Sequence, residues 1–109
     1  MAVCWFTFRI HDDATAEARR KKLYEIAEKL TGIVPSPGKS NVWKEPTSFG
    51  LLNSLKTVKS TAEALSAALL KDRDLLVVRA LSSKSTFVFG KVNDKVLLKK
   101  LIDTEYSEL

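Results

Sequence analysis

The densest group of potentially reactive side chains is His11-Asp12-Asp13, which directly follows an apolar N-terminal run. Two adjacent carboxylates beside an imidazole are able to bind a divalent metal ion and to serve as a general base. The same tripeptide also suits a loop between a strand and a helix, where an aspartate caps the free N–H groups of the first helical turn. We favour the capping role for Asp12 or Asp13 and name His11, Asp12 and Asp13 as the catalytic candidates if the chain is an enzyme.

The other nucleophiles and metal ligands form no recognisable catalytic pattern. Cys4 is the single cysteine and His11 the single histidine, so the chain builds neither an internal disulfide nor a cysteine-based zinc site. Cys4 falls on the apolar side of an alternating pattern and is expected to be a small core residue. We therefore predict no metal site and no cofactor, except for Mg²⁺ if the chain is a nuclease. The low cysteine content is typical of a reducing compartment, and we expect a cytoplasmic protein.

Positive charge is the main compositional bias, with a formal net charge of +5 at pH 7. Residues 32–71 carry five lysines against two glutamates, which is +3 of that total. Such a bias favours polyanionic partners such as RNA or DNA, although a solvated surface explains it as well. The residues predicted to contact nucleic acid are cationic: Arg9, Arg19, Arg20, Lys44, Lys56 and Lys59. Because aromatic residues make up only 8% of the chain, we expect phosphate contacts and little base stacking.

Hydropathy patterning predicts the elements that position these residues. Residues 2–10 alternate between apolar and mixed positions, which is typical of a central strand. Residues 14–30 show an apolar stripe at helical spacing, with the basic residues of its first half outside the stripe. Two strands are predicted next, at 42–45 and 47–53, because Pro46 has no N–H for a strand ladder and must break the run.

The second half of the chain continues the alternation of helix and strand. It predicts a helix at 57–70, a hairpin of strands at 74–82 and 85–92, and a short terminal helix at 93–102. Ser60 and Glu63 have the spacing of a capping box for the first of these helices, and Asn93 is the expected cap of the second. Residues 103–109 are acidic and expected to fray.

The order of elements predicts an α+β protein with a single domain, residues 1–109. Without its last two elements the chain has the βαββαβ order of a ferredoxin-like fold, an antiparallel sheet with both helices on one face. An extra C-terminal strand and a short helix follow. The second sheet face is apolar at Val3, Trp5, Leu75 and Val77, so something must cover it. We expect a homodimer to which the last strand and the terminal helix contribute; cover by the terminal helix alone is the alternative.

Short motifs within residues 1–81 follow a recognisable order. An apolar first strand and a basic first helix precede "TSF" and a Leu-Asn-Ser end, and "TAEAL" then leads through Asp72 and Asp74 into "LLVV". In this order the chain resembles a small ferredoxin-like family related to the CRISPR spacer-acquisition nuclease subunit, which includes VapD-like ribonucleases and SinR-like proteins. The resemblance implies a ferredoxin-like homodimer that acts on nucleic acid or is held near it.

One position departs from the pattern of the nuclease members of that family. In those members an aspartate at the end of the first strand holds a divalent metal ion across the dimer interface, and the matching position here is Arg9. A guanidinium repels a metal ion, but it pairs well with a phosphate or with a carboxylate at the dimer seam. The resemblance therefore implies binding without an intact metal-nuclease site.

We predict a small, basic, homodimeric nucleic-acid-binding module that does not associate with membranes. One alternative is a metal-dependent endoribonuclease that uses Asp12 or Asp13, with His11 nearby. Another alternative is a protein-interaction subunit with no role on nucleic acid, since one fold carries many unrelated functions. The choice between RNA and DNA is left open.

Overall fold

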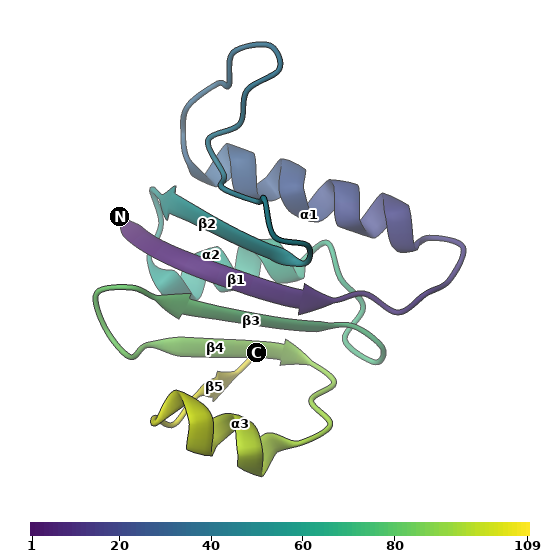
Figure 1. The fold of residues 1–109 in the computed structure, drawn as a ribbon, viewed down its shortest axis with the longest axis vertical. Coiled ribbons are helices and arrows are strands. Elements are labelled where there is room, and N and C mark those ends of the chain that lie inside the picture. Colours follow the sequence, from purple (N-terminus) through teal and green to yellow (C-terminus); the bar gives the residue numbers. More distant parts are fainter.

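The computed structural model describes all residues 1–109. In chain order the elements are β1 (Ala2–Arg9), α1 (Ala16–Leu30), β2 (Phe49–Ser54), α2 (Val58–Ser66), β3 (Leu75–Ala80), β4 (Thr86–Gly90), α3 (Lys95–Ile102) and β5 (Ser107–Glu108). The strands form one sheet in the order β2-β1-β3-β4-β5, in which only the β4–β5 pair is parallel (Figure 1). This confirms the α+β, ferredoxin-like architecture with an extra C-terminal strand and helix. None of the three helices is long and apolar enough to cross a lipid bilayer.

Alternation along the strands decides which side chains enter the core. Cys4, Phe6 and Phe8 of β1 point to the face that α1 and α2 cover, and all three are buried. Leu23 of α1 and Leu65 of α2 pack against that face without any solvent exposure. Burial of such side chains is the main stabilising term of the fold. Burial also raises the pKa of the Cys4 thiol to about 11, so Cys4 is the core residue expected from its pattern.

Gly50 shows how closely β1 and β2 fit together. It pairs with Phe6 in the antiparallel register, and a Cβ atom at Gly50 would lie 2.3 Å from the Phe6 ring. The missing side chain thus leaves the room that the ring occupies. Phe6 in turn stacks on Phe8 with 6.2 Å between ring centroids and lies 6.1 Å from the ring of Tyr24 in α1.

The region around Pro46 differs from the predicted pair of strands. Residues 42–45 form no strand; they contribute one bridge, in which Trp43 and Leu51 exchange backbone hydrogen bonds of 2.9 Å. β2 begins only after Ser48, which has a positive φ of 56°. Pro46 lacks an N–H and has a restricted φ, so regular pairing along the edge of β2 stops before it.

The starts of α2 and α3 and the C-terminal tail also differ from the predictions. Thr57 caps α2 by accepting a hydrogen bond from the Ser60 N–H, so the predicted box of Ser60 with Glu63 does not form. Asp94, rather than Asn93, caps α3. The tail was expected to fray because it is acidic, but its backbone pairs with β4 as the short strand β5.

The second face of the sheet is only half covered. α3 lies beside β4, away from α2, which lies behind the sheet in Figure 1. On this half of the face Val77 and Val88 are buried, and Arg79 donates a hydrogen bond of 3.1 Å to the Ile102 carbonyl at the end of α3. The half formed by β1 and β2 has no such cover, and Val3 there is 43% exposed. The terminal helix alone therefore leaves part of the face open.

Gly50→Ala is expected to destabilise the protein, because the new methyl group overlaps the Phe6 ring inside a packed core. Overpacking of this kind costs about 1–3 kcal/mol of unfolding free energy, which urea denaturation measures. Phe6→Leu removes the ring, so it should lower stability by itself but make Gly50→Ala less costly in the double variant. Strictly additive effects of the two substitutions would contradict the overlap.

Candidate functional site

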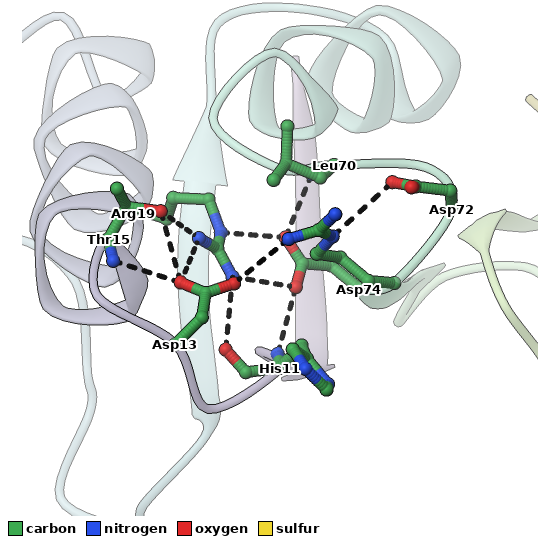
Figure 2. A network of polar contacts seen from close by, with 8 residues as sticks. His11, Asp13, Thr15, Arg19, Leu70, Asp72 and Asp74 are labelled. Carbon is green, nitrogen blue, oxygen red and sulfur yellow. Dashed lines mark hydrogen bonds and ion pairs between the residues drawn. The ribbon is translucent and has the colours of Figure 1, made fainter.

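A buried aspartate, Asp74, joins three parts of the fold beside the predicted catalytic candidates (Figure 2). It has no solvent exposure, and its carboxylate accepts hydrogen bonds from the N–H groups of His11 at 2.9 Å and Leu70 at 2.8 Å. Arg19 of α1 completes the set, with Nε at 3.0 Å and Nη2 at 3.2 Å from the two carboxylate oxygens. The end of β1, helix α1 and the loop before β3 thus share one carboxylate.

Arg19 is buried, with 7% of its surface exposed, contrary to its predicted place outside the apolar side of α1. Its Nη1 also lies 2.8 Å from Oδ1 of Asp13, and its Nη2 donates to the His11 carbonyl at 3.0 Å. Every nitrogen of this guanidinium therefore has an acceptor inside the protein (Figure 2). A buried arginine requires such partners. Asp74, its fully buried partner, is 55 residues away in sequence.

These contacts decide the protonation states of the two acids. A hydrogen bond from Arg19 holds the pKa of Asp13 well below its usual range. Burial by itself raises the pKa of Asp74, but the N–H groups of Leu70 and His11 and the Arg19 guanidinium outweigh it, so the net shift of this pKa is downward. Both carboxylates are therefore ionised at neutral pH and already neutralised by arginine.

Asp13 thus has a structural role in place of the N-cap or metal ligand considered from the sequence. The residue before α1 is Thr15, and its side chain makes no capping bond; Asp13 instead accepts a hydrogen bond of 2.9 Å from the Thr15 N–H. Arg73 places a second guanidinium 3.4 Å from Asp13. Asp12 and His11 are exposed. No group of three or more His, Cys, Asp or Glu side chains is placed to hold a metal ion.

An open depression of about 610 Å³ lies at the end of β1. Its lining consists of Arg9, Ile10, His11, Asp12, Asp72, Arg73, Lys91 and Asn93. Three cations against two carboxylates leave this lining with a formal charge of +1. Arg73 is paired with Asp72 and Asp13, whereas Arg9 and Lys91 have no carboxylate within ion-pair distance. Arg9 donates a 2.9 Å hydrogen bond from Nη2 to the Lys91 carbonyl, which keeps these two residues together.

Arg20 and Lys44 lie close together on the outer side of α1, but glutamates surround them. Both line a hollow of about 440 Å³, where Lys44 Nζ lies 5.1 Å from the centre of the Tyr24 ring and Arg20 lies over the Phe8 ring. With Lys21 the hollow has three cations, and its three glutamates cancel their charge. A neutral surface attracts phosphate less than the depression at the end of β1 does.

Lys56 and Lys59 lie at the opposite end of the sheet from Arg9. They follow β2, whose last residue, Ser54, pairs with Ala2 at the start of β1. The length of β1 therefore separates these lysines from Arg9, which is about 20 Å at the usual rise of a strand. The six predicted cations thus do not form one surface. Arg9 lies at the end of β1, Arg20 and Lys44 lie beside α1, and Lys56 and Lys59 follow β2. Arg19 lies in the interior.

Three aromatic rings, which we call the ring cluster, gather on the open half of the second face. Trp5 of β1 and Phe49 of β2 stack with ring centroids 6.1 Å apart and ring planes 22° apart. Trp43, from the bridge beside β2, meets Phe49 edge-on at 6.1 Å. The low aromatic content predicted little stacking surface, but the strand register concentrates these rings in one place.

Comparison of the chain with protein-family models, with curated proteins and with solved structures gave no match. The resemblance to relatives of the spacer-acquisition nuclease subunit therefore stays a prediction, as does the cytoplasmic location. What the fold and the site define is a ferredoxin-like domain with an open sheet face that carries rings and unpaired cations.

Asp74→Asn is expected to destabilise the protein by about 3–5 kcal/mol, since it removes the fully buried one of the two carboxylates that pair with Arg19 and leaves only Asp13 to balance its charge. The difference in unfolding free energy between the parent and the variant should depend on pH. Folding lowers the pKa of both Asp74 and Asp13, so their stabilisation is complete above the ordinary carboxyl pKa of about 4 and is lost as the pH falls below it. Urea unfolding at a series of pH values should show the parent approaching the variant only in acid.

Asp12→Asn is the matched control, because Asp12 is exposed and lies outside the network of Figure 2. This substitution should leave the stability at neutral pH and its acid dependence unchanged. An Asp74→Asn protein as stable as the parent at neutral pH would show that the buried ion pair contributes little to folding.

Proposed function

We propose that the protein is a small nucleic-acid-binding module that contacts phosphates through Arg9 and Lys91. The observation that carries the proposal is this pair of adjacent cations, without carboxylate partners, at an open depression. Arg9 uses only Nη2 for a contact within the protein, which leaves further N–H groups for phosphate oxygens. Lys91 adds a compact positive charge beside it.

The electrostatics of the surrounding sheet support the same proposal. Strands β1, β2 and β3 contain no Asp or Glu, so the open face has no strand carboxylate that repels a phosphate. The net charge of +5 adds a general attraction to polyanions. Binding of this kind releases counterions and is expected to depend strongly on salt and weakly on base sequence.

The proposed activity is binding, with no catalytic step. The ribonuclease alternative needs Asp12 or Asp13 to hold a cation, but Asp13 is already bound by Arg19 and Arg73. Arg9 stands where the resembled nucleases have an aspartate, and a guanidinium repels a metal ion from the same end of β1. Both features favour binding over hydrolysis.

The homodimer is part of the proposal, with α3 as its contact. Val96, Leu97 and Leu101 are 80%, 47% and 72% exposed, and helical geometry places them on one side of α3. An exposed row of apolar side chains marks a protein–protein contact. A two-fold contact between the α3 helices of two copies would leave the ring cluster and Arg9 accessible.

A gel of end-labelled RNA with the purified protein, run with magnesium and again with a chelator, is the first test of this function. We expect a mobility shift without shortening of the RNA under both conditions. Shortening that requires magnesium would support the ribonuclease alternative and make Asp12 its first candidate. Neither a shift nor cutting would favour the protein-interaction alternative.

Arg9→Gln combined with Lys91→Gln should weaken binding and reduce the slope of log K against log salt by roughly 2, about one for each lost phosphate contact. The matched control is Lys56→Gln with Lys59→Gln, which removes the same charge at the other end of the sheet. Titrations with labelled RNA at several salt concentrations measure both slopes. A slope that falls only in the control variant would move the binding site to the start of α2.

Leu97→Ser combined with Leu101→Ser is expected to convert the dimer to a monomer, because the apolar contact of α3 is lost. Light scattering during size-exclusion chromatography measures the change in mass. Ile33→Ser with Val34→Ser is the control, since these residues are also exposed, by 62% and 92%, but follow α1. A parent protein that is monomeric at high concentration would contradict the proposed dimer.

A further inference from the structure

The ring cluster of Trp5, Trp43 and Phe49 is open to solvent. Trp43 is 48% exposed, and the other two rings are half-buried. α1 and α2 cover the opposite face, where Phe6 and Phe8 are buried, and α3 lies beside β4 (Figure 1). No element of the chain therefore covers the half of the face on which the three rings lie.

Unpaired cations border the ring cluster. Arg79 is the direct partner of Trp5 in the β1–β3 register, and its hydrogen bonds use only Nη1, which donates to Thr86 Oγ1 and to the Ile102 carbonyl. Arg9 lies farther along β1 on the same face as Trp5, because side chains four positions apart in a strand share a face. Neither arginine has a carboxylate partner.

We propose that this face binds single-stranded nucleic acid, with bases stacked on the ring cluster and phosphates held by Arg79 and Arg9. The inference rests on the proposed nucleic-acid binding and adds which form of nucleic acid is bound. Bases of a single strand are free to lie on aromatic rings, whereas bases in a duplex are already stacked on each other. Rings beside unpaired cations supply the two contacts that single strands need.

A second copy of the chain fits this face less well than a polyanion does. In a two-fold contact the same patch of both copies is buried, so Arg79 and Arg9 of each copy would be enclosed together in one interface. β1, β2 and β3 provide no carboxylate to separate them, and burying unpaired like charges is costly. Phosphates neutralise the same guanidiniums instead.

Three probes of equal length test the inference by fluorescence anisotropy at one salt concentration: a single-stranded oligonucleotide, an abasic strand with the same phosphates, and a duplex. The base-bearing single strand should bind at least about tenfold more tightly than the abasic strand, because each stacked base adds affinity. Both tryptophans of the chain belong to the ring cluster. Their emission should therefore change with the base-bearing strand and not with the abasic one.

Substitutions in the ring cluster separate stacking from phosphate contacts. Trp43→Leu should weaken binding of the base-bearing strand about tenfold and leave the abasic strand unaffected. Trp43 lies outside the regular strands and is half exposed, so we expect the fold to tolerate this change. Trp5→Phe keeps a ring and should bind nearly as the parent does, whereas Trp5→Leu should lose the preference for bases. Leu70→Ala, at a 40% exposed position after α2, is the control.

Each outcome decides the inference. Equal binding of the base-bearing and abasic strands, both weakened by Arg9→Gln, would overturn stacking and leave the proposed phosphate contacts intact. Preference for the duplex would also overturn it. Failure of all three probes to bind would overturn the proposed function as well. A dimer that shields both tryptophans from iodide in the absence of any probe would assign this face to a second copy and overturn the inference.

Discussion

The buried carboxylate of Asp74 is the interaction on which the rest of the structure depends. It holds the end of β1 through the His11 N–H, α1 through Arg19, and the loop before β3 through the Leu70 N–H. Removing an ionised carboxylate from water is costly, and the guanidinium and the two N–H groups replace its lost hydration. The Asp74 carbonyl also accepts a 2.9 Å hydrogen bond from the Lys91 N–H. The walls of the depression at the end of β1 are therefore anchored to the same residue.

This network separates structural cations from available ones. Arg19 forms ion pairs with Asp74 and Asp13, and Arg73 forms an ion pair with Asp13 at the rim of the depression. Arg9 comes from the same end of the sheet but meets only a backbone carbonyl. Charge counting treats these three arginines alike, although their surroundings differ. The cation left without a carboxylate is the one that carries the proposed function, because only an unpaired charge gains from meeting a phosphate.

The uneven cover of the sheet has a similar consequence. α1 and α2 bury one face, whereas α3 and β5 reach only part of the other, so the half formed by β1 and β2 stays open. Trp5, Trp43 and Phe49 are concentrated there, although the chain as a whole has few rings. Aromatic side chains that are gathered at one exposed place mark a candidate interaction surface. Its position beside Arg79 and Arg9 connects the open face to the proposed phosphate contacts.

The sequence by itself determined most of the elements and their order, because apolar alternation in β1 and helical spacing in α1 follow from the periodicity of the local backbone. The exceptions are the strand predicted at 42–45, which does not form, and the tail expected to fray, which pairs with β4 as β5. It also placed Cys4 in the core. Only the tertiary structure decided the contacts between distant segments: Arg19 and Asp74 are 55 residues apart, and nothing local to either indicates the pair. The ring cluster likewise depends on the register that sets Trp5 opposite Leu51, and not on composition. Which side chains are buried and which charges are paired depends on the segments that come into contact, and these contacts are set by the fold of the whole chain.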